Sequence, residues 1–126
     1  MTDFRVLVTG SRDWRDWRAI FKALDDIYAQ HPHLTVVHGA CPTGADKYAN
    51  DWAAGAAVWG SKNVSIDSHP ADWTAFGKAA GFRRNAEMVA SGADLCLAFI
   101  RNGSRGASHC AGLAEESGIP TRRYEA

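Results

Sequence analysis

The sequence lacks most of the features that would place it in a specialised class of protein. Its 14 basic and 14 acidic side chains cancel to a formal net charge of zero, so it has no surplus of Lys and Arg for non-specific contact with nucleic-acid phosphates. No apolar run approaches the ~20 residues that span a membrane, and Asp3 and Arg5 interrupt the short apolar stretch that a signal peptide would need. We therefore expect a cytoplasmic protein with no membrane partner and no nucleic-acid partner.

Disulfide and metal frameworks are also missing. The three cysteines, Cys41, Cys96 and Cys110, are an odd number without Cys-x-x-Cys spacing, which favours reduced thiols over disulfides. A zinc site would have to combine His38 and Cys41 with His109 and Cys110, but the spacing is irregular and the order of strands would separate the two pairs. We predict no metal site and no cofactor.

What remains is a chain of ordinary globular composition, with 126 residues of which 46% are hydrophobic and 22% charged. A chain of this length hides roughly two thirds of its unfolded surface on folding, which is enough for a core without disulfide or metal staples. Neither a repeat nor a plausible linker divides the sequence. We predict a single domain over residues 1–126.

Short apolar runs alternate with longer stretches of helical period. The pattern predicts strands at residues 4–9, 35–38, 64–67 and 94–100, with an edge strand in the last few residues. It predicts helices at residues 17–28, 45–56, 73–91 and about 107–114, with Thr43 and Asp46 as a capping box before the second. Trp17 belongs to the apolar stripe of its helix, so we expect it in the core or at a subunit interface. Strict alternation means right-handed crossovers and a parallel sheet covered on both faces. The predicted fold class is α/β, a single Rossmann-like doubly wound domain with a mainly parallel sheet.

Glycines gather in the loops that follow the predicted strands. In doubly wound sheets ligands bind beyond the carboxyl ends of the strands, where loops enter helix N-termini. Glycine lets backbone N–H groups approach an anion there, and the helix dipole favours negative charge. These loops therefore predict phosphate contact. They hold Gly10, Gly39, Gly44, Gly103 and Gly106, five of the 12 glycines.

The glycine loops nevertheless lack two familiar phosphate motifs. Gly39-x-x-x-x-Gly44 has the spacing of a P-loop, but Ala45 and Asp46 stand where Lys and Ser or Thr would be needed. The absent Lys and the added carboxylate argue against triphosphate hydrolysis. No Gly-x-Gly-x-x-Gly follows the first strand, which argues against ordinary dinucleotide-dependent dehydrogenase chemistry.

Four motifs follow one another over nearly the whole chain. They are Gly10-Ser11-Arg12-Asp13-Trp14, His38-Gly39-Ala40 with Gly44-Ala45-Asp46, Arg84-Asn85-x-x-Met88 and Gly106-x-x-His109. In this order they resemble the YspA/YpsA-related branch of the SLOG superfamily. The resemblance implies a Rossmann-like domain that binds a nucleotide or a nucleotide-derived small molecule such as ADP-ribose. Members of this branch are common in bacteria and phages.

The motifs and the glycine placement together predict a binding site. Backbone N–H groups of the glycine loops would hold phosphate, Arg12 and Arg84 would add charge-assisted hydrogen bonds, and Trp14 could stack on a base. The predicted ligand-binding residues are Gly10, Ser11, Arg12, Trp14, Gly39, Ala40, Gly44, Asp46, Arg84, Asn85, Gly106 and His109. We expect a module that senses or sequesters its ligand. The sequence leaves open whether the protein forms a homo-oligomer.

Two relatives within the superfamily supply alternatives. LOG phosphoribohydrolases carry Arg-Lys-x-x-Met and Pro-Gly-Gly-x-Gly-Thr-x-x-Glu motifs, which Arg84–Met88 and Asn102–Cys110 match in outline only. His109 falls about where their catalytic Glu is expected, and a His would not stabilise an oxocarbenium-like state, so no catalytic residue is assigned. The second alternative, DprA-like binding of single-stranded DNA, conflicts with the neutral charge and the lack of a basic stripe.

Overall fold

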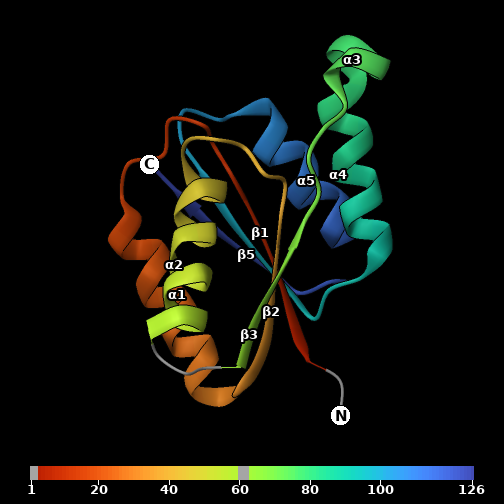
Figure 1. The fold of residues 1–126 in the computed structure, drawn as a ribbon. Helices are drawn as coiled ribbons and strands as arrows, with labels where there is room; N and C mark the ends of the chain where they lie inside the picture. Colours follow the sequence, from red (N-terminus) through yellow and green to blue (C-terminus); the bar gives the residue numbers. More distant parts are fainter. Residues whose placement is uncertain (1–2, 60–62) are drawn as a thin grey trace.

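The computed structural model describes residues 3–59 and 63–126 (Figure 1). Its strands form one sheet in the order β3-β2-β1-β4-β5, with every neighbouring pair parallel. The strands are β1 (Phe4–Gly10), β2 (His33–His38), β3 (Asn63–Ser68), β4 (Leu95–Ile100) and β5 (Thr121–Glu125). The helices are α1 (Trp17–Gln30), α2 (Ala45–Trp59), α3 (Trp73–Phe76), the 3₁₀ turn η1 (Gly77–Ala79), α4 (Ala80–Ser91) and α5 (Arg105–Glu116). The predicted Rossmann-like doubly wound fold is confirmed, including the edge strand near the C-terminus. Among the described residues, no helix has the length and apolarity needed to cross a membrane.

Helices cover both faces of the sheet. Helices α1 and α2 lie on one side, and α4 and α5 lie on the other (Figure 1). Successive strand side chains point to opposite faces, so Val6 and Val8 join the core beneath α1 and α2. Leu7 between them packs instead with Met88 of α4 and Cys110 of α5. The central strands are therefore apolar on both faces, as a parallel sheet requires.

The helix predicted over residues 73–91 is interrupted. Helix α3 ends at Phe76, and Gly77, with φ +53, is the first residue of the 3₁₀ turn that leads into α4. An L side chain rarely adopts a positive φ, so glycine at this position permits the break. The apolar spacing runs through both helices and gives no sign of the interruption. The predicted Thr43–Asp46 capping box is also wrong in its use of Asp46, because that carboxylate accepts a hydrogen bond from the backbone N of Cys41 at 3.2 Å.

The strand order reverses between β1 and β4. The chain proceeds from β1 through β2 to β3 on one side, and then returns to the other side of β1 with β4. The two strands pair from Val6↔Leu95 to Gly10↔Phe99, so both end at the same edge of the sheet. Loops diverging from such a switch point leave a crevice outside the carboxyl ends of the strands. This crevice is where a ligand site is expected.

Candidate functional site

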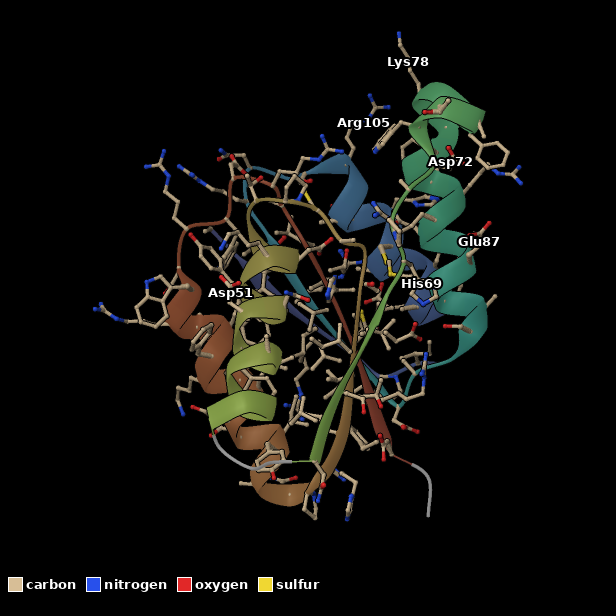
Figure 2. The ribbon with its side chains drawn as sticks, in the orientation of Figure 1. Asp51, His69, Asp72, Lys78, Glu87 and Arg105 are labelled. Atoms are coloured by element: carbon tan, nitrogen blue, oxygen red, sulfur yellow. The ribbon has the colours of Figure 1, made fainter. Side chains whose placement is uncertain are left out.

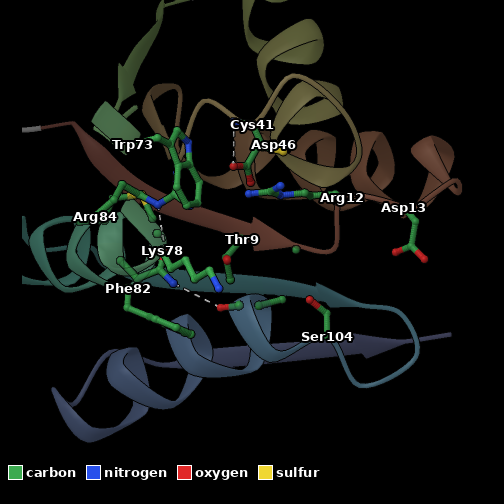
Figure 3. A pocket seen from close by; sticks show the side chains of 16 residues that line it. Thr9, Arg12, Asp13, Cys41, Asp46, Trp73, Lys78, Phe82, Arg84 and Ser104 are labelled. Carbon is green, nitrogen blue, oxygen red and sulfur yellow. Dashed lines mark hydrogen bonds between the residues drawn. The ribbon is translucent and has the colours of Figure 1, made fainter. Parts of the chain in front are cut away.

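A cavity of about 400 Å³ lies at this edge of the sheet (Figure 3). Its volume is within the ~300–1,000 Å³ typical of small-molecule sites. Its walls come from the loops after β1 and β2, from the arm formed by α3, η1 and α4, and from the start of α5. The lining residues are Thr9, Gly10, Arg12, Asp13, Cys41, Asp46, Trp73, Lys78, Gly81, Phe82, Arg84, Asn85, Met88, Ser104, Gly106 and Ala107. We refer to this cavity as the pocket.

The structure brings six of the twelve predicted site residues together in the pocket. Those six are Gly10, Arg12, Asp46, Arg84, Asn85 and Gly106, from four separate segments of the chain. The other six lie outside the lining: Ser11, Trp14, Gly39, Ala40, Gly44 and His109. Most of these six position the lining residues.

Arg84 is held in place from three directions. Its Nε donates to Oδ1 of Asn85 at 3.0 Å, and its Nη1 donates to the carbonyl oxygens of Gly39 and His69. A Cβ atom at Gly39 would overlap the guanidinium, so a side chain at this position would displace Arg84 from its present contacts. The contacts join α4 to the ends of β2 and β3. They fix a positive charge at the wall of the pocket.

Asn85 links Arg84 to the start of α5. Its side chain is buried, and Nδ2 lies 3.3 Å from both the carbonyl oxygen of Gly106 and Nδ1 of His109. The amide can donate one proton to each of these acceptors while its oxygen accepts from Arg84. His109 also contacts Phe82, edge to face, with 4.6 Å between ring centroids. His109 therefore lies behind Asn85 and Phe82, outside the pocket lining.

Asp46 is a buried carboxyl group in the pocket. It comes from the second residue of α2, and its Oδ2 accepts from Cys41 N. Burial raises the pKa of this carboxyl above its ordinary value, although hydrogen bonds from the Cys41 and Gly39 backbone and the charges of His38 and Arg84 act in the opposite direction. A titratable group shifted by burial inside a cleft is typical of a functional site.

Arg12 and Trp73 contact each other at the pocket. Arg12 follows β1 and is exposed, and its Cζ lies 5.5 Å from the centre of the Trp73 ring. Figure 3 shows the Arg12 side chain extending toward Trp73, between Asp46 and Thr9. Lys78 of η1 also lines the pocket, and Arg105 lies at the same end of the molecule (Figure 2). Positive side chains therefore gather at this edge of the sheet, although the chain as a whole is neutral.

The first turn of α5 forms another wall. Gly106 is exposed there, with open space where a Cβ would be, and Ser104 before the helix makes no side-chain capping hydrogen bond. The first backbone N–H groups of an α-helix have no partner within the helix. Together with the helix dipole, they favour an anion at this point.

Two predicted ligand-binding residues, Ser11 and Gly44, hold the loops together. The Ser11 hydroxyl is buried and accepts a hydrogen bond from Arg101 N at 2.7 Å, which ties the β1 loop to the end of β4. Gly44 has φ +74, and a Cβ there would lie 2.6 Å from the carbonyl oxygen of Arg12. The adjacent Ala45 N donates to the Ser11 carbonyl oxygen at 3.3 Å. These contacts pack the loops after β1 and β2 against each other.

The expectation that Trp14 could stack on a base does not fit its position. Its ring is buried and meets Phe99 edge to face at 5.4 Å, and its Nε1 donates to the Asp16 carbonyl oxygen at 2.9 Å. The ring is thus a core residue beneath α1. Trp17 is less buried than the apolar stripe suggested, with 42% of its surface exposed and its ring against Phe21.

Several lining residues were not predicted, chiefly Trp73, Lys78, Gly81 and Phe82. All four belong to the arm from α3 to α4, and the sequence shows only a continuous Ala-rich helical pattern there. The one available signal was the position of Trp73, which ends the loop after β3. In contrast, Arg12, Asp46 and Arg84 were identifiable because each belongs to a motif beside a strand end or on the third predicted helix.

The chain resembles a known family and a known phage protein. The family model described as "YspA, cpYpsA-related SLOG family" matches residues 4–76, which include β1 to β3 and the Arg12 and Asp46 loops. The "Gene 61 protein" of Mycobacterium phage D29 is 48% identical over 125 residues, covering 95% of each chain. No solved structure matches the chain. With its doubly wound sheet and its motif-bearing loops gathered around one pocket, the chain belongs to the YspA- and cpYpsA-related SLOG family.

Proposed function

We propose that the protein binds a nucleotide or a nucleotide-derived ligand of the ADP-ribose class in the pocket, and that it senses or sequesters this ligand. The observation that supports the proposal most directly is the convergence of Arg12 and Arg84 on one cavity at the strand-order switch point. The two residues lie 72 positions apart in the sequence, yet both line the pocket with the first turn of α5. Family membership is consistent with nucleotide-related ligands.

The chemistry of the pocket suits an anionic ligand of moderate size. An arginine offers several donors in a planar fork that matches phosphate oxygens. Arg84 is held by Asn85 and by backbone oxygens, so little further ordering is needed when the ligand binds. Arg12 is exposed and can move toward the ligand. A small pocket of this kind can hold phosphate without the broad positive surface that the neutral chain lacks.

Thermal shift against AMP, ADP and ADP-ribose tests the proposal. A ligand at 100 times its dissociation constant adds about 2.7 kcal/mol of stability, which raises the melting temperature by roughly 10 °C at this chain length. Absence of a shift with every nucleotide and ADP-ribose derivative at millimolar concentration would refute nucleotide binding.

Arg12→Ala and Arg15→Ala form a matched pair for this assay. Both residues are exposed and belong to the loop between β1 and α1, but only Arg12 lines the pocket. Loss of charge-assisted hydrogen bonds should weaken nucleotide binding about ten- to a hundredfold in Arg12→Ala. Calorimetric titration should show Arg15→Ala within about twofold of the unchanged protein. Equal effects of the two substitutions would contradict the proposed role of Arg12.

Asp46 favours a second candidate function, hydrolysis of the N-glycosidic bond of a nucleoside monophosphate. A carboxylate can stabilise the positive charge that develops on the ribose ring during this reaction. Asp46 supplies a buried carboxyl in the pocket, whereas His109 has no carboxyl and does not line the pocket. Water would add to the ribose carbon as its bond to the base breaks, leaving ribose 5-phosphate and the free base.

Chromatography of AMP after long incubation with the protein tests this second function. Release of adenine, rising with pH as Asp46 ionises and abolished by Asp46→Asn, would support it. Intact AMP at pH 5 to 8, in a sample that binds AMP by calorimetry, would leave the protein as a binding module alone.

A further inference from the structure

The arm from α3 to α4 exposes three large aromatic side chains. Trp73 is 49% exposed, Phe76 is 43% exposed and Phe82 is 47% exposed. Aromatic rings gain substantially from burial, so large rings gathered on one short arm indicate contact with something outside the core. Figure 1 shows that this arm projects beyond the sheet at the end where α5 begins.

The three rings differ in what they face. Trp73 and Phe82 line the pocket, whereas Phe76 does not and instead lies 4.0 Å from the Arg83 guanidinium. In Figure 3 the charged end of Arg12 lies beside the Trp73 ring, and the Lys78 side chain runs between Trp73 and Phe82. The pocket therefore has aromatic walls on the arm and anion-binding groups at the β1 loop and α5.

Local packing keeps the Trp73 ring close to the pocket. The position that a Cβ would take at Gly81 lies 3.4 Å from Cη2 of Trp73, so the indole lies over the first turn of α4. The Arg12 guanidinium lies over the indole, 5.5 Å from the ring centre, so the ring face that it covers is directed toward a pocket-lining side chain that can move. Asp72 caps α3 by accepting from Ala75 N at 3.0 Å, which orders the short helix that carries the ring.

We propose that Trp73 and Phe82 form a base-binding wall, on which the purine or pyrimidine of the ligand stacks while its phosphate faces Arg12 and the start of α5. This inference rests on the proposed nucleotide binding and deepens it, because it assigns the base to the aromatic rings of the arm and the phosphate to Arg12 and the start of α5. Planar bases stack on aromatic side chains with little dependence on sequence. Arg12 makes a cation–π contact with the Trp73 indole, which places a positive charge next to the base-binding wall. Phe82 closes the site from the α4 side.

Calorimetric titration of AMP, ADP-ribose and ribose 5-phosphate tests the wall, because ribose 5-phosphate keeps the anion and lacks the base. Stacking on a base contributes about 1–3 kcal/mol, so Trp73→Ala should weaken AMP and ADP-ribose about five- to a hundredfold. The same variant should bind ribose 5-phosphate within about twofold of the unchanged protein. Phe82→Ala should show the same pattern with a smaller effect.

Phe76→Ala is the matched control, since it removes an exposed ring of the same arm that does not line the pocket. It should change none of the three affinities by more than about twofold. Trp73→Phe keeps a ring for stacking and should retain most of the nucleotide affinity, which guards against a folding defect in Trp73→Ala. The base-binding wall is wrong if the Trp73→Ala protein binds AMP and ADP-ribose normally, or if it loses ribose 5-phosphate to the same degree. If the unchanged protein binds none of the three compounds, nucleotide binding itself fails, and the wall with it.

Discussion

Arg84 donates a hydrogen bond from Nε to Oδ1 of Asn85, the residue that follows it in α4, over 3.0 Å. Consecutive helical residues do not normally face each other. Here the longer side chain folds back over the buried amide, and the other end of that amide reaches α5 at Gly106 and His109. The buried Asn85 amide therefore fixes α4 relative to the first turn of α5, and both segments line the pocket.

Asn85→Ala should destabilise the protein and weaken ligand binding together. The substitution leaves the Arg84 Nε, the Gly106 carbonyl oxygen and the His109 ring without this partner, and such a loss costs about 1–3 kcal/mol. We expect a melting temperature lower by roughly 4–12 °C in calorimetry. Glu87→Ala, on the exposed side of the same helix, is the control. Similar melting of the two variants would show that the amide has no positioning role.

Asp46 should make stability fall as pH rises above the ordinary carboxyl range. Burial raises its pKa in the folded protein above 3.8, the value expected of the unfolded chain. The folded state then binds this proton more tightly, so stability is lost as pH rises from 3.8 through the raised pKa. Asp46→Asn keeps an acceptor for Cys41 N without a charge. It should be more stable than the unchanged protein at pH 7, with a flatter pH profile.

Scanning calorimetry between pH 4 and pH 7 measures this difference, and Asp51→Asn is the comparison. Asp51 lies on the same helix, but it is exposed and paired with Lys47 at 2.7 Å. Its substitution should change stability by about 1 kcal/mol or less. A melting temperature for Asp46→Asn that stays below that of the unchanged protein throughout the range would contradict the dominance of burial.

Ala40→Gly should stabilise the protein. Ala40 has φ +59, in the left-handed region that is about 1–2 kcal/mol unfavourable for a residue with a Cβ. After allowance for the greater freedom of glycine in the unfolded chain, the expected gain is about 0.5–1 kcal/mol by denaturant unfolding. Ala86→Gly, on the exposed side of α4, should instead lose about 1 kcal/mol. Equal losses at both positions would show that Ala40 is unstrained.

Substitutions at Trp14 should change the stability of the protein, whereas substitutions at Trp73 should change its affinity for the ligand. Trp14→Ala removes a buried ring that packs on Phe99, which should cost about 3–5 kcal/mol. Trp14→Phe keeps most of that packing and should bind AMP as the unchanged protein does. Denaturant unfolding and AMP titration of both variants check the assignment. Weaker AMP binding by a well-folded Trp14→Phe protein would show that Trp14 takes part in ligand binding.

The order of strands and helices was readable from the sequence because it depends on local pattern. The apolar run at Phe4–Thr9 and the stripe from Trp17 to Tyr28 each satisfy one period over their whole length, and the structure places β1 and α1 there. The break at Gly77 was not readable, because the apolar spacing continues through it. Glycine indicates only that a positive φ is permitted.

The sequence by itself determined the fold class, the family and the edge of the sheet where Arg12, Asp46 and Arg84 meet. Each of these depends on residues close together in the chain, or on the rule that parallel strands end at one edge. Only the tertiary structure decided which side chains face the pocket. Trp14 and Trp73 both follow a strand by a few residues, but Trp14 meets Phe99 in the core while the interrupted arm carries Trp73 to the pocket. Their directions depend on contacts with distant elements, and a local pattern contains no information about those contacts.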